Sequence, residues 1–120
     1  MQDRLETVFP PYRFDYVNQC VWDGNRRVYL TPKAFAVLKH LLETPGKLVT
    51  KEKLLEAVWP QTFVSDAVLK VCIGEVRRAL RDKFRAPRFI ETAHRRGYRF
   101  IGDVWDTASA QQYFERQAGA

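Results

Sequence analysis

The sequence predicts an α+β fold in which an N-terminal antiparallel β-sheet is followed by three helices and a C-terminal β-hairpin. Two adjacent segments carry this prediction. Residues 65–82 place apolar side chains at helical spacing on one side, and residues 88–101 place two β-prone runs around a basic tip. A helix with a basic outer face, followed at once by a basic hairpin, is the plan of a winged helix-turn-helix.

The chain of 120 residues is long enough for one hydrophobic core, and we expect one domain over residues 12–104. Its β region contains three short β-prone runs, at 12–16, 19–23 and 27–30. The segment Asp23-Gly24-Asn25 between the last two has the composition of a hairpin turn. Residues 1–11 are expected to form a flexible lead-in, and residues 105–120 a tail or the start of a linker.

Each of the three expected helices begins with the same local signal. Thr31, Thr50 and Ser65 are suited to the N-cap, with an apolar residue just before each and another four positions later. Pro32 takes the first helical position, where its missing N–H costs nothing. The first helix is expected to end at Thr44-Pro45-Gly46. No capping box is complete, because the third helical positions, which need Glu or Gln, are occupied by Ala34, Lys53 and Val68.

The three helices are expected to share one apolar core. Its members recur every three or four residues, as a buried helix face requires. They are Phe35, Leu38, Leu41, Leu42, Leu54, Leu55, Val58, Leu69, Ile73, Val76 and Leu80.

The opposite side of the third helix is unusual for a solvated face, because it carries small and apolar residues among basic ones. Val71 and Ala67 are suited to contact thymine methyl groups, and Arg78 is suited to a guanine edge. The flanking basic residues suit phosphates: Lys70, Arg77 and Arg81. The alternative is an ordinary surface helix whose arginines are merely solvated.

The hairpin is the second basic element. Residues 88–92 and 98–101 are its expected strands, and Gly97 is expected to take a positive φ in the turn. The tip then presents His94, Arg95 and Arg96, and narrow minor grooves attract inserted arginine. The alternative is a basic turn without a function.

Charge is concentrated in the half of the chain that holds these two elements. The whole chain has 20 Lys and Arg against 14 Asp and Glu, a net charge of +6, whereas residues 62–103 hold ten against five. This asymmetry favours a polyanionic partner.

The sequence argues against several other classes of protein. Cys20 and Cys72 are isolated and fit a reducing cytoplasm, and the two histidines, His40 and His94, have no metal-ligand spacing. There is no Gly-rich phosphate loop, catalytic triad or carboxylate pair, no apolar run near ~20 residues, and no signal peptide. We therefore expect a cytoplasmic protein that is not an enzyme and uses no cofactor or metal.

Four segments in order resemble the OmpR/PhoB-type winged-helix effector domain: LTPKAFAVLKHLL, VTKEKLLEAVW, VSDAVLKVCIGEVRRAL and FIETAHRRGYRF. The resemblance covers about residues 12–104 and is greatest to versions placed N-terminally in larger regulators, including the CadC/ToxR-like group. It implies a nucleoid-associated transcription regulator in signal transduction that binds double-stranded DNA as a dimer or in tandem. RNA polymerase is a further implied partner, this segment is expected to make no membrane contact, and sensing is expected to lie in another domain or chain.

The resemblance also implies roles for individual residues. The recognition helix, residues 65–81, would lie in the major groove, and the wing, residues 88–101, in the minor groove. The residues assigned to base reading are Lys70, Val71, Glu75 and Arg78. Those assigned to the DNA backbone are Lys51, Trp59, Arg77, Arg81, Thr92 and Tyr98. The residues of the wing tip assigned to the minor groove are His94, Arg95, Arg96 and Gly97. The loop that in family members contacts RNA polymerase corresponds to Pro60, Gln61, Thr62 and Phe63.

Several positions depart from the family pattern. Ala67, Gly74 and Glu75 stand where basic residues are frequent, and His94 stands where the minor-groove arginine is frequent. Glu75 can accept from a cytosine amino group, or it can repel phosphates or pair with Arg78. Gly74 costs about 0.5–1 kcal/mol of helix stability relative to alanine, which a close approach of DNA or of a neighbouring helix would explain.

These departures keep two other functions open. One is a protein-interaction winged helix that has lost DNA binding, and the other is a double-stranded RNA binder. Salt-dependent binding to a duplex separates the first from a DNA-binding domain, and competition between A-form RNA and B-form DNA separates the second.

Overall fold

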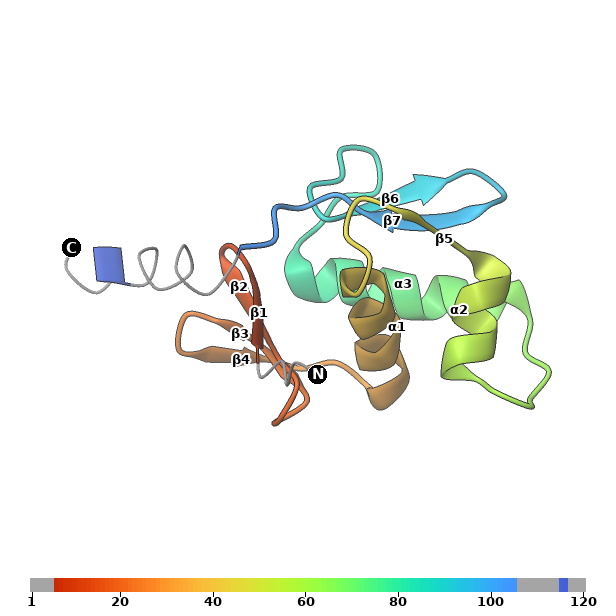
Figure 1. Ribbon diagram of the computed structural model, residues 1–120, viewed down its shortest axis with the longest axis horizontal. Coiled ribbons are helices and arrows are strands. Elements are labelled where there is room, and N and C mark those ends of the chain that lie inside the picture. Colours follow the sequence, from red (N-terminus) through yellow and green to blue (C-terminus); the bar gives the residue numbers. More distant parts are fainter. Residues whose placement is uncertain (1–5, 106–114, 117–120) are drawn as a thin grey trace. The chain divides into compact units, whose positions relative to one another are not determined.

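The computed structural model describes residues 6–105 and 115–116, which belong to two compact units (Figure 1). One unit contains the segment up to Val28 together with the segment from Asp103, and the other contains Tyr29–Gly102. The tail expected over residues 105–120 lies mostly outside the described residues.

The first unit is built on a four-stranded antiparallel sheet in the order β1-β2-β3-β4. Three of its strands were expected: β2 (Tyr12–Asp15), β3 (Cys20–Asp23) and β4 (Arg26–Val28). The fourth, β1 (Glu6–Phe9), lies in the segment expected to be a flexible lead-in, so that expectation is wrong for these four residues. The strand forms because its backbone pairs along the whole of β2 and because three of its four side chains are buried.

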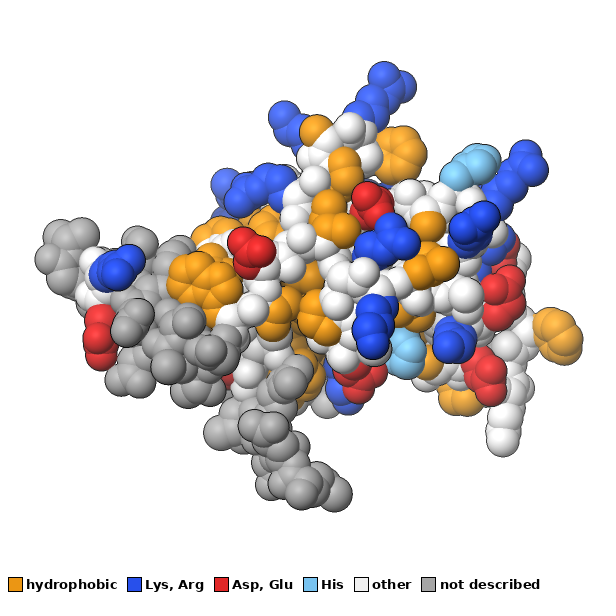
Figure 2. Space-filling view, turned by 45° about the horizontal axis from the view of Figure 1, so that its top comes forward, with side chains coloured by type: hydrophobic (Ala, Val, Ile, Leu, Met, Phe, Trp, Pro, Cys, Tyr) orange, Lys and Arg blue, Asp and Glu red, His pale blue; other side chains and the backbone are white. Residues whose placement is uncertain are grey.

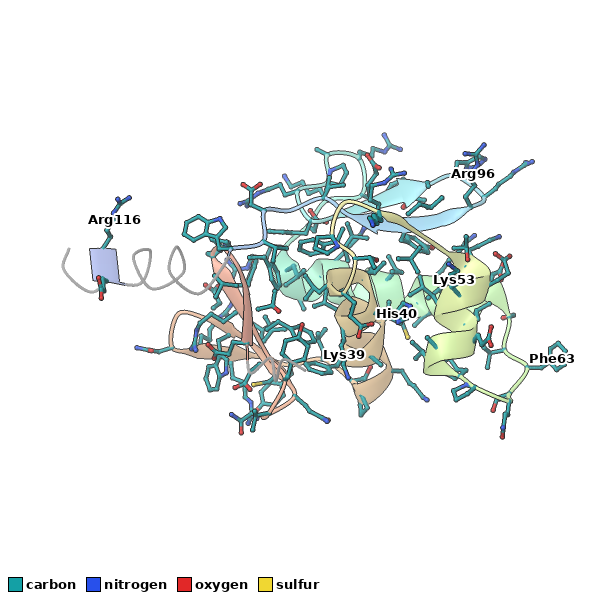
Figure 3. All side chains as sticks on the ribbon, in the orientation of Figure 1. Lys39, His40, Lys53, Phe63, Arg96 and Arg116 are labelled. Carbon is teal, nitrogen blue, oxygen red and sulfur yellow. The ribbon has the colours of Figure 1, made fainter. Side chains whose placement is uncertain are left out.

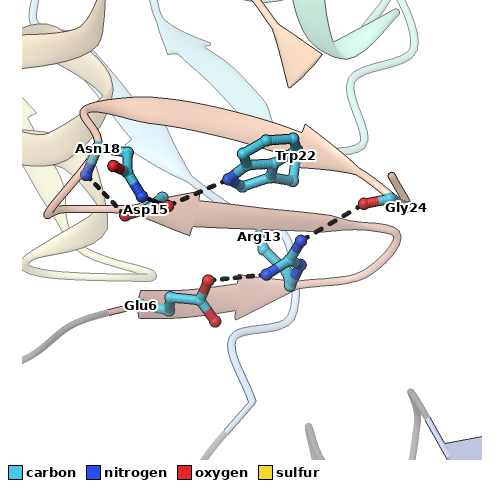
Figure 4. A network of polar contacts seen from close by, with 6 residues as sticks. All are labelled: Glu6, Arg13, Asp15, Asn18, Trp22 and Gly24. Carbon is cyan, nitrogen blue, oxygen red and sulfur yellow. Dashed lines mark hydrogen bonds and ion pairs between the residues drawn. The ribbon is translucent and has the colours of Figure 1, made fainter. Parts of the chain in front are cut away.

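One face of this sheet carries a polar network (Figure 4). The guanidinium of Arg13 lies over the Trp22 ring at 5.6 Å and forms an ion pair with Glu6 at 2.8 Å. The Asp15 carboxylate accepts hydrogen bonds from the backbone and side chain of Asn18 and from the Trp22 indole N–H. Burial by itself would raise the pKa of Asp15, but these hydrogen bonds together outweigh it and hold the pKa below its usual value.

The second unit contains the three expected helices, α1 (Pro32–Leu42), α2 (Lys51–Val58) and α3 (Asp66–Leu80). The N-caps are where the sequence predicts them: the Thr31 and Thr50 hydroxyls accept from the N–H groups of Ala34 and Lys53. Ser65 is the N-cap of α3, but its side chain makes no capping hydrogen bond. Every expected core residue is buried except Leu55, which is half-buried.

A three-stranded sheet packs beside the helices in the order β5-β7-β6. The expected hairpin is formed by β6 (Ile90–Ala93) and β7 (Gly97–Phe100), and β5 (Leu48–Thr50) adds a strand that the sequence analysis missed. A run of three residues directly before a helix is too short to show strand periodicity, so β5 is recognisable only from its pairing with β7.

The reason expected for Gly97 is wrong. The positive φ in the turn belongs to Arg95, at 62°, whereas Gly97 is the first residue of β7 and pairs with Thr50. A Cβ at position 97 would lie 2.0 Å from the carbonyl oxygen of Val49 and 2.8 Å from the Cα of Thr50. Glycine is therefore required here because β5 passes too close for any side chain.

Candidate nucleic-acid interface

Lys51, at the first position of α2, lies where three elements of the second unit meet. Its backbone N–H donates to the carbonyl of Arg96 in the wing tip at 3.0 Å, and its ammonium pairs with Asp66, the first residue of α3, at 2.9 Å. The hydrogen bond with Asp66 is the main reason that the pKa of Lys51 is raised. The start of α2, the start of α3 and the tip of the wing are thus held together at one end of the unit.

Arg77 connects the middle of α3 to the first strand of the wing. Its Nη2 donates to the carbonyl oxygen of Ile90 at 2.9 Å and to the Thr92 hydroxyl at 2.8 Å, and its guanidinium lies over the Phe84 ring. Burial lowers the pKa of Arg77, although arginine stays protonated. Two residues expected at the phosphates, Arg77 and Thr92, therefore bind each other and fix the wing against α3.

Asp82 holds the other end of the wing. This buried carboxylate accepts hydrogen bonds from three successive backbone N–H groups, those of Arg88, Phe89 and Ile90, with the shortest at 2.6 Å. The role of Asp82 was not predicted from the sequence, although a signal exists. An acidic residue just after a helix C-terminus is unfavourable for the helix dipole and suggests a partner elsewhere in the fold.

Glu75 connects α3 to α1. Its carboxylate accepts from the backbone N–H of Thr31 at 2.6 Å and from the Thr31 hydroxyl at 2.9 Å. In a capping box, a Glu at the third helical position accepts from the N-cap N–H, but α1 has Ala34 there. Glu75 supplies the missing carboxylate from another helix, and this pairing differs from both the base contact and the Arg78 pair considered from the sequence.

Several basic side chains of the unit have no partner among the described residues. Among the described residues, no hydrogen bond or ion pair engages the side chains of a set of basic residues on the outer side of α3 and at the wing tip. This set consists of Lys70, Arg78, Arg81, Arg95 and Arg96. Val71, next to Lys70 in the chain, is 67% exposed. Figure 2 shows Lys and Arg side chains projecting from the protein surface at several places, including the upper and right-hand edges of the view. The outer face of α3 thus offers apolar and cationic groups with no partner in the described chain.

The remaining predicted residues are divided between buried and exposed positions. Tyr98 is buried, which raises its pKa, and Trp59 is half-buried with the Lys33 ammonium over its ring. Pro60, Gln61 and Thr62 are exposed in the loop between α2 and α3, and the Phe63 side chain is fully exposed and points away from the helices (Figure 3). His94 is exposed at the wing tip.

The described residues contain no cluster of three or more side chains that would hold a metal ion. Both cysteines are free and buried, and burial raises the pKa of Cys72. Within the described part of the chain, no helix is long and apolar enough to cross a membrane.

Comparison with known proteins identifies the class to which this arrangement belongs. Residues 25–100 match the family described as "Transcriptional regulatory protein, C terminal". The chain therefore belongs to this family, whose members are the winged-helix domains of OmpR/PhoB type.

Individual relatives agree with this assignment. The transcriptional regulator HilA of Salmonella typhi is 43% identical over 77 residues, covering 64% of this chain and 14% of HilA. The response regulator DrrB of Thermotoga maritima, an OmpR/PhoB homolog, superposes with a TM-score of 0.76 at 35% identity, covering 83% of this chain and 46% of DrrB.

The DNA-binding domain of Klebsiella pneumoniae RstA, solved in complex with the RstA box, superposes with a TM-score of 0.73 at 27% identity. This match covers 82% of this chain and 98% of that domain. The chain thus matches the isolated domain almost completely but spans only about a seventh of HilA.

Proposed function

We propose that this chain is the DNA-binding part of a transcription regulator and binds double-stranded DNA in a sequence-specific manner, with α3 in the major groove and the β6–β7 wing in the minor groove. The observation that carries the proposal is the unpaired, apolar and cationic outer face of α3. This face lies on a helix fixed to the wing through Arg77 and Asp82. The related RstA domain was solved in complex with its DNA box, which supports binding of double-stranded DNA by this chain.

The residues on this surface divide into two groups by chemistry. Val71 and Arg78 would read bases, since a methyl-sized apolar group suits thymine and a guanidinium suits the guanine O6 and N7 atoms. Lys70 lies beside them. The side chains of Arg81, Arg95 and Arg96 have no partner among the described residues. Arg81 would therefore contact phosphates, and Arg95 and Arg96 would enter the minor groove.

Four other expected contacts are assigned differently in this proposal. Glu75, Arg77 and Thr92 position α3 and the wing, since the Glu75 carboxylate binds Thr31 and the Arg77 Nη2 binds the Thr92 hydroxyl, although the buried Arg77 Nε has no hydrogen-bond partner among the described residues. Lys51, paired with Asp66, aligns the start of α3.

The first experiment is selection of bound sites from a random duplex pool at near-physiological salt, followed by sequencing. Enriched half-sites repeated about one turn apart, ~10–11 bp, would support binding as a dimer or in tandem. Binding without enrichment would contradict sequence specificity. The absence of duplex binding would favour a protein-interaction winged helix, and preference for A-form RNA would favour an RNA binder. Binding to chromosomal DNA would place the protein in the cytoplasm with the nucleoid.

Arg78→Ala is expected to reduce the preference for the selected site over random duplex by about fivefold to 150-fold, because one bidentate base contact discriminates by about 1–3 kcal/mol. The measurement is a competition titration of both duplexes. Arg85→Ala is the matched control: it removes the same charge from an exposed position beyond α3 and should leave the preference unchanged. An equal loss on both duplexes for Arg78→Ala would show that Arg78 reads no base.

We further propose that the loop of Pro60–Phe63 contacts RNA polymerase. The supporting observation is the complete exposure of Phe63, an apolar side chain that packs on nothing in its own unit. Phe63→Ala is expected to leave operator affinity unchanged and to reduce transcription in a purified polymerase assay. A variant that activates transcription as fully as the unmodified chain would contradict this contact.

A further inference from the structure

Two residues of α3 are poor choices for the stability of the isolated domain. The first is Gly74, in the interior of the helix. A Cβ built there meets only the Arg78 Nη1 atom, at 3.9 Å, which is an ordinary contact with the far end of a flexible side chain. No neighbouring helix needs the space, so one of the two explanations considered from the sequence is excluded. Alanine would fit and would stabilise the helix.

The second residue is Arg81, which ends the helix. The N–H groups of Arg81 and Asp82 donate to the carbonyls of Arg78 and Arg77 at 3.2 and 2.8 Å, which is the Schellman arrangement. Arg81 itself has φ 55° and ψ 40°, the left-handed conformation in which glycine is usual and a side chain is strained. Its side chain is exposed and makes no hydrogen bond or ion pair within the described residues. The left-handed turn satisfies the last carbonyls of the helix, but no contact among the described residues requires an arginine rather than a glycine in it.

The two positions lie on the same side of the helix. They are seven residues apart, which is about two turns, and Arg78 lies between them one turn from Gly74. This is the outer, unpaired face of α3. Glycine instead of alanine at position 74 and arginine instead of glycine at position 81 both lower the stability of the free domain, and both point to a partner that covers this face. Neither the missing side chain at position 74 nor the cation at position 81 is required for folding, so their use lies outside the chain.

We propose that Gly74 is the point at which a DNA duplex comes closest to α3, and that Arg81 is kept in its left-handed conformation to place a cation on a phosphate beside that point. This inference rests on the proposed DNA binding and deepens it. Without a Cβ, the helix backbone at position 74 can approach the duplex more closely, which brings Val71 and Arg78 into reach of the bases. Each residue thus lowers the stability of the free domain and raises its affinity for DNA.

The test measures thermal stability and duplex affinity on the same variants. Gly74→Ala should raise Tm by about 2–8 °C, because the helix gains propensity, and should weaken binding to the selected duplex by about fivefold or more without changing the salt dependence. Gly74→Leu should weaken binding further, because its side chain is larger than that of alanine.

Arg81→Gly should also raise Tm, and it should flatten the dependence of log K on log salt by about 0.9, the value of one lost phosphate contact. Arg81→Asn should flatten the slope equally, since asparagine tolerates the left-handed conformation but carries no charge. Gln19→Gly is the matched control. It relieves the same kind of backbone strain at φ 53° in the other unit and should leave affinity and slope unchanged.

The outcomes separate the inference from the function on which it rests. If the unmodified chain binds no duplex, the proposed function fails. If it binds and Gly74→Ala and Arg81→Gly bind equally well, the function stands and this inference is overturned. A fall in Tm for Gly74→Ala would also overturn it, because glycine would then be required by the fold.

Discussion

Gly97→Ala is expected to destabilise the helical unit by about 3 kcal/mol or more, the upper end of the cost of overpacking. The added Cβ would lie 2.0 Å from the Val49 carbonyl oxygen, and the backbone of β5 cannot move aside as a flexible side chain can. Relief requires β5 and β7 to separate, which breaks the ladder that carries the wing. Urea denaturation followed by circular dichroism would measure the loss as a lower midpoint.

The control for this prediction is the same substitution at a different place. Gly74→Ala adds an identical methyl group in open space and is expected to shift the urea midpoint upward. If the urea midpoint falls for Gly97→Ala and rises for Gly74→Ala, the same added methyl group has opposite effects, and the difference is due to the space available at each position. A Gly97→Ala protein as stable as the unmodified chain would mean that β5 and β7 do not approach as closely as the structure has them.

Asp82→Ala is expected to cost about 3–4 kcal/mol of the free energy of unfolding. The substitution leaves three backbone N–H groups without their acceptor, and a buried donor without a partner costs about 1–3 kcal/mol. Amide hydrogen exchange offers a local readout: the amides of Arg88, Phe89 and Ile90 should exchange faster than the rest of the unit.

Two further variants define what Asp82 does. Asp82→Asn keeps one acceptor oxygen and should lose less stability than Asp82→Ala. Asp103→Ala removes an exposed carboxylate and should change the midpoint little. Because Asp82 fixes the start of β6 to the end of α3, Asp82→Ala should also weaken binding to every duplex at temperatures where the protein remains folded. If the amides of Arg88, Phe89 and Ile90 exchange at the same rates in Asp82→Ala as in the unmodified chain, the role given to this carboxylate is refuted.

Whether a feature could be predicted from the sequence depends on how far apart in the chain its interacting residues are. The starts of α1 and α2 could be predicted because an N-cap hydroxyl bonds to an N–H group only three residues away. The buried faces of the helices could be predicted because helical spacing alone determines which residues share a side. The order of the elements other than β1 and β5 followed from the same local signals, and the family was inferred from the resemblance of four segments to known members.

The site was harder to predict because its polar residues bind distant partners. Nothing near Glu75 in the chain indicates that it caps a helix 44 residues earlier. Arg77 has the composition of a phosphate contact, yet its guanidinium binds Ile90 and Thr92. The sequence shows which basic residues could contact DNA, but only the folded chain shows which of them already have partners within the protein.

The sequence by itself thus determined the class of the protein: the helices, their caps, the basic hairpin and the concentration of charge are all local or compositional properties. Only the tertiary structure decided which side chains are left for a partner, where β5 lies, and why position 97 must be glycine. The physical reason is that hydrogen bonds and steric contacts depend on the positions of atoms brought together by folding, whereas periodicity and capping depend on residues that are already neighbours along the chain.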